Sequence, residues 1–437
     1  MPQLPQIDSV KAPDKIVAQA TRARRFPWLN IPFILVVALL VSYGLVVVMS
    51  AVANDRDYSF TNQLAGVALG IVFMVLVWRF DYRRLSDFTM LFLIVNVALI
   101  LSPHIPGLGT DAGMGAQSWL KLGIQVQPGE FAKLFLAFFF AAYLFDHRDQ
   151  LAVGGKKMLG LQLPRIKDLG PIIVVWIVAM GVLVIQHDLG TSLMFFAMFV
   201  SMLYVATGRK SWIIIGFIAF AAGAFLAANI FSHVGARVDA WLHPFSTEQY
   251  GKEYGGSYQL VTGIFGLASG GMMGTGLGQG HPSLTPIANS DYIYAAAGEE
   301  LGLTGLLATL MLYLLIIAAG MITAMKIKDG FGKLLASGLV FTMAFQVFTV
   351  VGGITLVIPL TGLTLPYMAA GGSSLIANYL LATLLVIISN AANKPEDDLN
   401  SDTFQYEAMQ ALRNRDMKHR TQPTEPIART VTGGSNE

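Results

Sequence analysis

Long apolar runs separated by short polar turns fill the chain from residue 31 to residue 388. Ten such runs can be placed, with approximate bounds 31–52, 64–78, 88–101, 130–145, 171–185, 189–206, 212–231, 301–325, 334–351 and 373–388. Runs of this length and hydrophobicity are typical of helices that cross the bilayer core rather than of helices inside a soluble domain. The pattern therefore predicts an all-α polytopic membrane protein with about ten transmembrane helices.

One polar stretch, from Ser232 to about Ala295, interrupts this pattern between the seventh and eighth runs. It contains a glycine-rich segment, residues 270–280, and it ends in Asn289-Ser290-Asp291-Tyr292. We expect this stretch to form a large loop outside the bilayer. Loops that are held by a rigid scaffold commonly carry binding and catalytic residues.

The composition agrees with a membrane protein and narrows the possible chemistry. Of the 437 residues, 54% are hydrophobic and only 13% are charged, whereas a soluble domain has about 25% charged residues. The absence of cysteine excludes disulfides, a thiol nucleophile and cysteine-type metal sites. The net charge of +2 says little about partners, and the distribution of the charges says more. We expect a membrane protein with no nucleic-acid partner.

The basic residues predict the orientation of the chain in the membrane. If the N-terminal tail is cytoplasmic, 24 of the 29 Lys and Arg residues fall on the cytoplasmic side. Because membrane proteins carry their excess of positive residues on that side, we expect both termini in the cytoplasm and the 232–295 loop on the outer side. The N-terminus lacks the apolar segment of a cleaved signal peptide, so the first span should act as its own signal.

Three regions follow from these boundaries. They are an N-terminal cytoplasmic tail (1–29), a ten-helix membrane domain (30–392) and a C-terminal cytoplasmic tail (393–437). The C-terminal tail is polar with mixed charge, and it is predicted to be disordered.

Ionisable side chains within or beside membrane spans are energetically costly, so they are candidate functional residues. Glu130 lies in the first turn of the fourth run, three residues before Lys133 on the same helix face. Either Glu130 neutralises Lys133 inside the membrane, or the two residues contact a substrate. Asp188, at the start of the sixth run, is well explained as a helix N-cap, and His187 as a solvated turn residue.

The glycine-rich segment 270–280 matches no phosphate-binding loop, because no Gly-Lys-Ser/Thr follows its glycines. Within it, Gly274-Thr275-Gly276-Leu277-Gly278 is only weakly similar to a dinucleotide-binding fingerprint and lacks the βαβ context. We expect a backbone that turns tightly or lies close to a ligand.

Asp291 lies at the outer end of the eighth run, next to aromatic residues. A carboxylate in a half-buried aromatic environment tends to have a raised pKa, which suits a general base; the alternative role is a helix N-cap. Glu299 and Glu300 follow and cannot both face lipid. We expect one of them to pair inside the bundle, with Arg237 or Lys133 as the candidate partner.

Several ordered blocks within residues 30–392 resemble the signature motifs of the SEDS family, whose name stands for shape, elongation, division and sporulation. The matching blocks are Gly115-Ala116-Gln117-Ser118-Trp119, Gln127-Pro128-Gly129-Glu130-Phe131-Ala132-Lys133, Gln186-His187-Asp188-Leu189-Gly190-Thr191, Tyr258-Gln259, Ser269-Gly270-Gly271 with Gly274, Asp291-Tyr292-Ile293-Tyr294 with Glu299-Glu300-Leu301-Gly302, and residues 366–374. The resemblance implies a ten-helix fold with a large fourth outer loop, which agrees with the count of apolar runs.

The resemblance also implies an activity, a partner and a set of site residues. The implied activity is a peptidoglycan glycosyltransferase that polymerises lipid II at the outer face of the bacterial cytoplasmic membrane, with a class B penicillin-binding protein as partner. In that family the Asp aligned with Asp291 is the essential catalytic residue. The substrate-binding candidates that we take from the matching regions are Glu130, Lys133, Asp188, Arg237, Gln259, Glu299, Glu300 and Ser373.

Three motifs depart from the family pattern. The family usually has Pro-Ser-Glu at residues 128–130, where this chain has Pro-Gly-Glu, and His-Thr-Asp-Phe at residues 289–292, where it has Asn-Ser-Asp-Tyr. The family's Arg-Trp is replaced by Ser118-Trp119, which removes an expected contact to phosphate, and Lys121 is a candidate replacement. Residues 357–364 and 369–374 resemble the elongation branch of high-GC Gram-positive bacteria more than the division branch.

In this interpretation Asp291 is the candidate base for the 4-hydroxyl of the acceptor sugar. Arg237, Lys133 and Lys121 are candidates for offsetting the pyrophosphate charge. The sequence establishes no cofactor, and a divalent cation, Mg²⁺ or Mn²⁺, is a candidate for sharing that role. The three histidines of the outer loop (233, 243 and 281) have no metal-ligand spacing.

Alternatives from other classes stay open. A lipid II flippase also needs a polar cavity within a helix bundle, and a purely structural scaffold for a penicillin-binding protein would need no chemistry. A division-specific polymerase of the same family is a third alternative. The candidate charges gather at the outer face rather than at the midplane, which favours surface chemistry over alternating access.

Overall fold

The computed structural model describes residues 30–52, 60–78, 81–110, 118–121, 125–152, 157–158, 161–162, 177, 181, 188–252 and 256–393. In this part of the chain, nine of the ten predicted spans fall on helices. The fifth predicted span, 171–185, lies outside the described residues apart from Ile177 and Gly181, and so do the tails 1–29 and 394–437. The described residues up to Ala392 belong to one structural unit.

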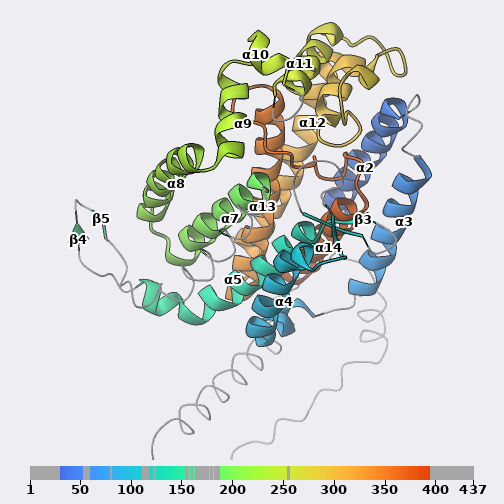
Figure 1. The fold of residues 1–437 in the computed structure, drawn as a ribbon. Coiled ribbons are helices and arrows are strands. Elements are labelled where there is room, and N and C mark those ends of the chain that lie inside the picture. Colours follow the sequence, from blue (N-terminus) through green and yellow to red (C-terminus); the bar gives the residue numbers. More distant parts are fainter. Residues whose placement is uncertain are drawn as a thin grey trace, which may run out of the picture. The chain divides into compact units, whose positions relative to one another are not determined.

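The nine helices that match predicted spans are α2 (Ile31–Ala51), α3 (Phe60–Val77), α4 (Thr89–Leu101), α5 (Pro128–Ala152), α7 (Leu189–Thr207), α8 (Ser211–Ile230), α12 (Ile293–Lys326), α13 (Gly330–Ile354) and α14 (Gly372–Ala392) (Figure 1). By length and composition, eight helical segments of the described residues could cross a membrane, and α3 adds a shorter apolar helix, Gln63–Val77. The prediction of an all-α polytopic membrane protein is confirmed.

Polar residues just before several helices explain where these helices begin. Asn30 Oδ1 accepts a hydrogen bond from Phe33 N at 3.2 Å at the start of α2, and Asp329 Oδ2 accepts one from Gly332 N at 2.9 Å at the start of α13. These bonds satisfy N–H groups that the first helical turn leaves without partners.

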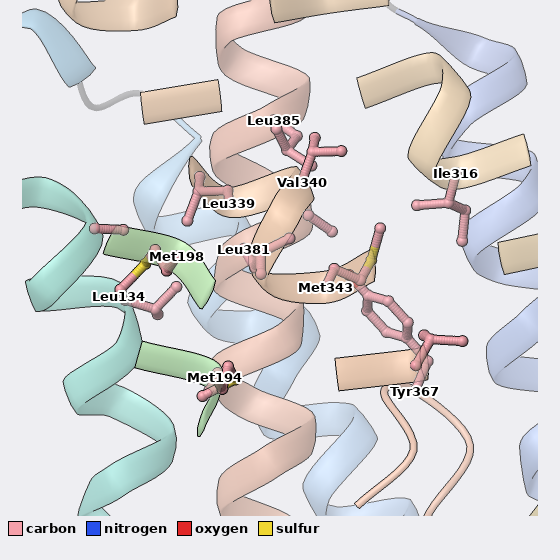
Figure 2. Packing of buried hydrophobic residues seen from close by; sticks show 14 of the residues in the cluster. Leu134, Met194, Met198, Ile316, Leu339, Val340, Met343, Tyr367, Leu381 and Leu385 are labelled. Carbon is pink, nitrogen blue, oxygen red and sulfur yellow. The ribbon is translucent and has the colours of Figure 1, made fainter. Parts of the chain in front are cut away.

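The helices differ in how far the rest of the described chain covers them. In the most apolar stretch of each helix, 78% of the residues are buried in α5 and 72% in both α13 and α14, against 6% in α8. Figure 2 shows buried leucine and methionine side chains packed between α5, α7, α13 and α14, among them Leu134, Met198 and Leu381. Close packing of this kind holds helices together where lipid supplies no hydrophobic driving force. The most buried helices are therefore a rigid scaffold for the site.

The stretch 232–295 is largely helical, although its polarity indicated a loop. It contains α9 (Ser232–Leu242), α10 (Thr247–Tyr250), α11 (Tyr258–Gly270) and the 3₁₀ helix η3 (Pro282–Leu284), and Figure 1 shows α10 and α11 near one end of α12. Short helices outside the apolar runs bury only one face, such as Leu260 and Val261 of α11. The helix α9 is polar, and α11 is apolar but has only 13 residues, too few to be recognised as a membrane span.

The remaining described elements are short. They are the 3₁₀ helices η1 (Tyr82–Phe88) and η2 (Ser102–His104), the strands β1 (Gly109–Thr110), β2 (Trp119–Lys121) and β3 (Gln125–Val126), and the strand pair β4 (Lys157–Met158) and β5 (Leu161–Gln162). The first three strands form an antiparallel sheet in which Leu120 lies opposite both Gly109 and Val126. This sheet occupies the loop that precedes α5.

The helix α12 begins at Ile293, earlier than the predicted start near Leu301, and it is broken at Gly302. Gly302 has φ 66° and ψ −169°, a backbone conformation that other residues rarely adopt. The predicted span therefore corresponds to the part of α12 after the break, and the part before it was assigned to the outer loop.

The glycine-rich segment 270–280 supplies hydrogen bonds to both sides of this break. After it, Leu303 N donates to Gly271 O at 2.9 Å and Thr304 N to Met272 O at 3.1 Å; before it, Glu299 O and Glu300 O accept from Thr275 N and Gly276 N, both at 2.9 Å. These bonds replace the helical ones that the break removes. The expectation of tight turns is confirmed by positive φ values at Gly271, Gly274, Gly276 and Gly278. The group that lies close to this backbone is α12, and a ligand beside the glycines stays a prediction.

We expect Gly302→Ala to lower the unfolding temperature of the detergent-solubilised protein. A Cβ at this position would lie 2.3 Å from Gly274 N, and alanine would be strained at φ 66°, at a cost of about 2 kcal/mol or more. Gly223→Ala in α8 is the matched control, because no described atom outside its own stretch of helix lies within 4 Å of its Cβ. Equal unfolding temperatures of the two variants would contradict this account of the break.

Candidate active site

Asp291 lies in the turn just before α12, at a half-buried position. Its Oδ1 accepts a hydrogen bond from Ser290 Oγ at 3.2 Å. Burial raises the pKa of this carboxyl to about 6, against the opposing effects of Ser290 and of the positive charge of Arg237. Tyr292 occupies the N-cap position of α12, and no side chain caps the helix there. The alternative role of Asp291 as a helix cap is therefore wrong, and its pKa suits a general base.

Arg237 projects from α9 toward the loop between α13 and α14. Its Nη1 donates hydrogen bonds to Thr361 O at 3.1 Å and to Leu360 O at 3.4 Å. Burial lowers the pKa of the guanidinium, while the negative charges of Asp188 and Asp291 act in the opposite direction. No ion pair of 4.0 Å or less joins Arg237 to either carboxylate in the described part of the chain. The three groups interact at longer range, with one positive charge near two carboxyl groups.

Asp188 caps α7, as its position in the sequence predicted. Its Oδ1 accepts a hydrogen bond from Thr191 N at 3.0 Å. Burial raises the pKa of this carboxyl, whereas the bonds from Thr191 and the charge of Arg237 lower it. A Cβ at Gly129 would lie 3.8 Å from Asp188 Oδ2, so the start of α5 also faces this carboxylate. Its neighbour His187 lies outside the described residues.

The loop between α13 and α14, residues 355–371, brings these distant residues together. It accepts the two hydrogen bonds from Arg237, and a Cβ at Gly362 would lie 3.7 Å from Asp291 Oδ2. A Cβ at Gly190 in the first turn of α7 would lie 2.8 Å from Thr361 O. Ala370 N also donates to Asn289 O at 2.8 Å, two residues before Asp291. The loop therefore contacts all three segments that carry the charged groups.

Lys133 is buried, with 1% of its surface exposed. Its Nζ donates to Glu130 Oε2 at 2.6 Å, to Gln346 Oε1 at 3.1 Å and to Asn378 Oδ1 at 3.2 Å. An ammonium group has three N–H donors, and these contacts occupy all of them. The geometry favours the interpretation in which Glu130 neutralises Lys133 inside the bundle, and it leaves no donor of Lys133 for a substrate.

The prediction that Glu299 or Glu300 pairs with Arg237 or Lys133 was wrong. Glu299 Oε1 accepts a hydrogen bond from His281 N at 2.7 Å. Glu300 Oε1 accepts bonds from Ser50 Oγ at 2.5 Å and from Gly278 N at 3.3 Å. Neither carboxylate pairs with Arg237 or Lys133, because both point toward the glycine-rich segment that crosses the break in α12.

The other candidate residues hold backbone segments or lie at the surface. Gln259 Nε2 donates to Pro286 O at 2.9 Å, five residues before Asp291 in the chain. Ser373 Oγ accepts a bond from Gln127 N at 3.0 Å, at the start of α5. Lys121 is exposed at the end of β2, and Ser118 is buried.

Trp241 belongs to this region and was missed in the sequence. Its Nε1 donates to Leu356 O at 2.8 Å, in the same loop that Arg237 contacts. The two residues are four apart on α9, which places them on one helix face. This spacing could have identified Trp241 if the segment had been recognised as a helix.

No group of three or more His, Asp or Glu side chains among the described residues could hold a metal ion. The divalent cation therefore stays a prediction, and its residues are not identified.

A bundle of apolar helices with a half-buried carboxylate and a guanidinium at one end defines a polytopic membrane protein with an enzyme-like polar site. The family model for cell cycle proteins of the FtsW, RodA and SpoVE type matches residues 30–394. The chain belongs to this family, which confirms the resemblance of its motifs to the SEDS proteins.

Two relatives distinguish the branches of the family. The chain is 43% identical over 382 residues to peptidoglycan glycosyltransferase RodA of Mycobacterium tuberculosis, covering 85% of this chain and 80% of that protein. It is 29% identical over 372 residues to a probable peptidoglycan glycosyltransferase FtsW of Geobacter metallireducens, covering 82% of this chain and 94% of that protein. The prediction of the elongation branch is confirmed.

A solved structure has the same fold. It is a chain of a peptidoglycan synthase complex that coordinates polymerization and crosslinking. The comparison gives a TM-score of 0.67 at 24% identity and covers 85% of this chain and 100% of that chain. At this identity the likeness concerns the fold alone.

We expect Lys133→Met to destabilise the protein strongly, by about 3–5 kcal/mol, because it leaves Glu130 buried without its cation. The double variant Glu130→Gln with Lys133→Met should recover part of this loss. Lys121→Met is the control, since Lys121 is exposed and its replacement should change stability by less than about 0.5 kcal/mol. Thermal unfolding in detergent measures all three. A Lys133→Met protein as stable as the wild type would contradict the structural role.

We expect Asp291→Asn to raise the unfolding temperature of the protein above that of the wild type, and to raise it more at higher pH. The folded pKa of about 6 exceeds the ordinary value of 3.8, so the stability that Asp291 contributes is present below about pH 4 and is lost as the pH rises through 6. Asparagine avoids this loss. The gain in unfolding temperature over wild type should therefore be larger at about pH 7.5 than at about pH 5. Gly223→Ala in α8, which removes no titratable group, should show no such trend; a pH-independent gain for Asp291→Asn would contradict the raised pKa.

Proposed function

We propose that this protein is a peptidoglycan glycosyltransferase that polymerises lipid II into glycan strands for cell elongation and shape. The observation that carries the proposal is the half-buried Asp291, with a pKa of about 6, near the guanidinium of Arg237 in a member of this family. The name of the Mycobacterium tuberculosis relative, peptidoglycan glycosyltransferase RodA, supports the same activity.

Asp291 is the general base in this proposal. It takes the proton from the 4-hydroxyl of the acceptor sugar as that oxygen attacks the anomeric carbon of the lipid-linked donor. A new glycosidic C–O bond forms, and the bond between the anomeric carbon and the pyrophosphate breaks, so the lipid pyrophosphate leaves with the electron pair. A base with a pKa of about 6 is largely deprotonated at neutral pH and still accepts a proton readily.

Arg237 offsets the charge that develops on the pyrophosphate. Its guanidinium is held by two backbone carbonyls, at 3.1 and 3.4 Å, so its position is set before the substrate binds, as electrostatic catalysis requires. Lys121 is a second candidate because it is exposed. Lys133 has no such role here, since its donors are occupied inside the bundle. A divalent cation would add to the same neutralisation of the pyrophosphate charge.

The protein is a multi-pass bacterial membrane protein. We infer from the charge distribution that both termini are cytoplasmic and that Asp291 faces the outer side of the cytoplasmic membrane. We further infer that it works with a class B penicillin-binding protein, since the related chain of known structure belongs to a peptidoglycan synthase complex.

We expect Asp291→Asn to lower the rate of lipid II polymerisation by at least about 100-fold, the usual contribution of a general base. The assay uses purified protein in proteoliposomes, with and without a class B partner, and measures glycan polymer that is insensitive to moenomycin. The wild-type rate should rise with pH through about 6. Asp239→Asn, exposed on α9, is the control and should keep the wild-type rate.

The same assay separates the alternatives. A flippase would move labelled lipid II across the vesicle membrane without forming polymer, and a scaffold would do neither. A near wild-type rate of polymerisation by Asp291→Asn would contradict the assignment of Asp291 as the base. Absence of polymer from the wild type with its partner would contradict the proposed activity.

A further inference from the structure

Ser50, Glu300 and Gly278 form a three-way contact between the first described span and the outer segment. Ser50 Oγ, in the last turn of α2, donates to Glu300 Oε1 at 2.5 Å. Gly278 N donates to Ser50 Oγ at 3.1 Å and to Glu300 Oε1 at 3.3 Å. The three residues come from α2, from α12 and from the glycine-rich segment, which lie far apart in the sequence.

We propose that Ser50 and Glu300 are positioning residues that hold the segment 278–290 and thereby set the position of Asp291. This proposal rests on the proposed function for Asp291 as the base. Among the described residues, the side-chain hydrogen bonds of Ser50 and Glu300 do not include Asp291. They act through the backbone of the segment that leads to it.

The segment before Asp291 needs such attachment because it has little secondary structure of its own. Between Gly271 and Tyr292 the only regular element is the short η3. An irregular backbone loses its fixed geometry unless contacts outweigh the conformational entropy of each residue. Three further hydrogen bonds lie outside the three-way contact. They run from His281 N to Glu299 Oε1, from Gln259 Nε2 to Pro286 O and from Ala370 N to Asn289 O. The attachments are therefore spread along the segment from its start to its end.

The contact continues the hydrogen bonds that repair the break in α12. The backbone carbonyls of Glu299 and Glu300 accept from Thr275 N and Gly276 N, and their side chains accept from His281 N and Gly278 N. Glu299 and Glu300 thus accept hydrogen bonds from four backbone N–H groups of the outer segment. Ser50 adds α2 to this set, so that the first span, the broken helix and the outer segment are joined at one place.

Glu300 is suited to this role rather than to substrate binding. It is 1% exposed, and its second oxygen, Oε2, has no hydrogen-bond partner in the described part of the chain. A buried carboxyl group is costly unless its hydrogen bonds repay the burial. The bonds it makes are those to Ser50 and Gly278, and Glu300→Gln keeps the accepting oxygen while removing the charge.

The other end of α2 offers a matched control. There, Asn30 Nδ2 donates to Ser389 Oγ at 3.0 Å, which ties α2 to α14. Ser50→Ala and Ser389→Ala each remove one hydroxyl that links α2 to another helix. Only Ser50 contacts the outer segment, so a general loosening of α2 and a specific loss of positioning give different results.

The experiment compares Ser50→Ala, Ser50→Thr, Glu300→Ala, Glu300→Gln and Ser389→Ala in the full-length protein. Hydrogen exchange of the peptides covering 278–291 should be faster by about fivefold or more in Ser50→Ala and Glu300→Ala, as expected for a lost hydrogen bond. The kcat of lipid II polymerisation should fall by about tenfold or more with little change in KM, because a displaced base slows the chemical step. The acidic limb of the rate should also move to lower pH, since a displaced Asp291 is better hydrated.

Ser50→Thr and Glu300→Gln keep the hydroxyl and the accepting oxygen, and both should stay near wild type, as should Ser389→Ala. The proposal is overturned if hydrogen exchange of peptides 278–291 is unchanged in Ser50→Ala. It is also overturned if exchange is faster but the kcat and the acidic limb of the rate are unchanged, or if Ser389→Ala lowers the kcat as much as Ser50→Ala does. Ser50→Ala removes a single hydroxyl, so it provides the test even if Glu300→Ala fails to fold. A wild type that makes no polymer contradicts the proposed function, whereas the exchange comparison reports on the attachment without any activity.

Discussion

The break in α12 at Gly302 is the constraint on which the outer part of the structure depends. Backbone groups near a membrane must find hydrogen-bond partners within the protein, because lipid offers none. The glycine-rich segment meets this need, and a Cβ at Gly274 would lie only 2.1 Å from Glu300 O. The segment is rich in glycine because two backbones meet there without side chains between them. The path of this segment in turn helps to fix the position at which the chain enters α12, next to Asp291.

The charged groups of the candidate site depend on a second element, the loop between α13 and α14. Arg237, Asp188 and Asp291 come from α9, the start of α7 and the start of α12, and this loop contacts each of these segments. The loop offers backbone carbonyls to Arg237, so the guanidinium keeps its place without a close ion pair. A carboxylate near a guanidinium that is not bonded to it keeps a raised pKa and stays free to act as a base.

The polar residues near the spans divide into two groups by their contacts. Glu130 with Lys133, and Glu299 with Glu300, use their side chains to hold helices or backbone segments. Asp291 has one hydrogen bond, from the neighbouring Ser290, and Arg237 has the backbone carbonyls of the loop. The buried charges of the first group are therefore structural, whereas Asp291 is bound only by a neighbouring hydroxyl and keeps a raised pKa that suits a base.

The sequence by itself determined the helical membrane class, the nine spans that the structure describes and the cap at Asp188, and it predicted Asp291 as the catalytic residue. Those features depend on local properties, namely apolar length, cap preference and a motif. Only the tertiary structure decided that residues 232–295 are largely helical, that Glu300 pairs with Ser50 rather than with Arg237 or Lys133, and that Trp241 joins the site. These depend on which distant segments meet, and no local pattern records that Ser50 and Glu300, which are 250 positions apart, share one hydrogen bond.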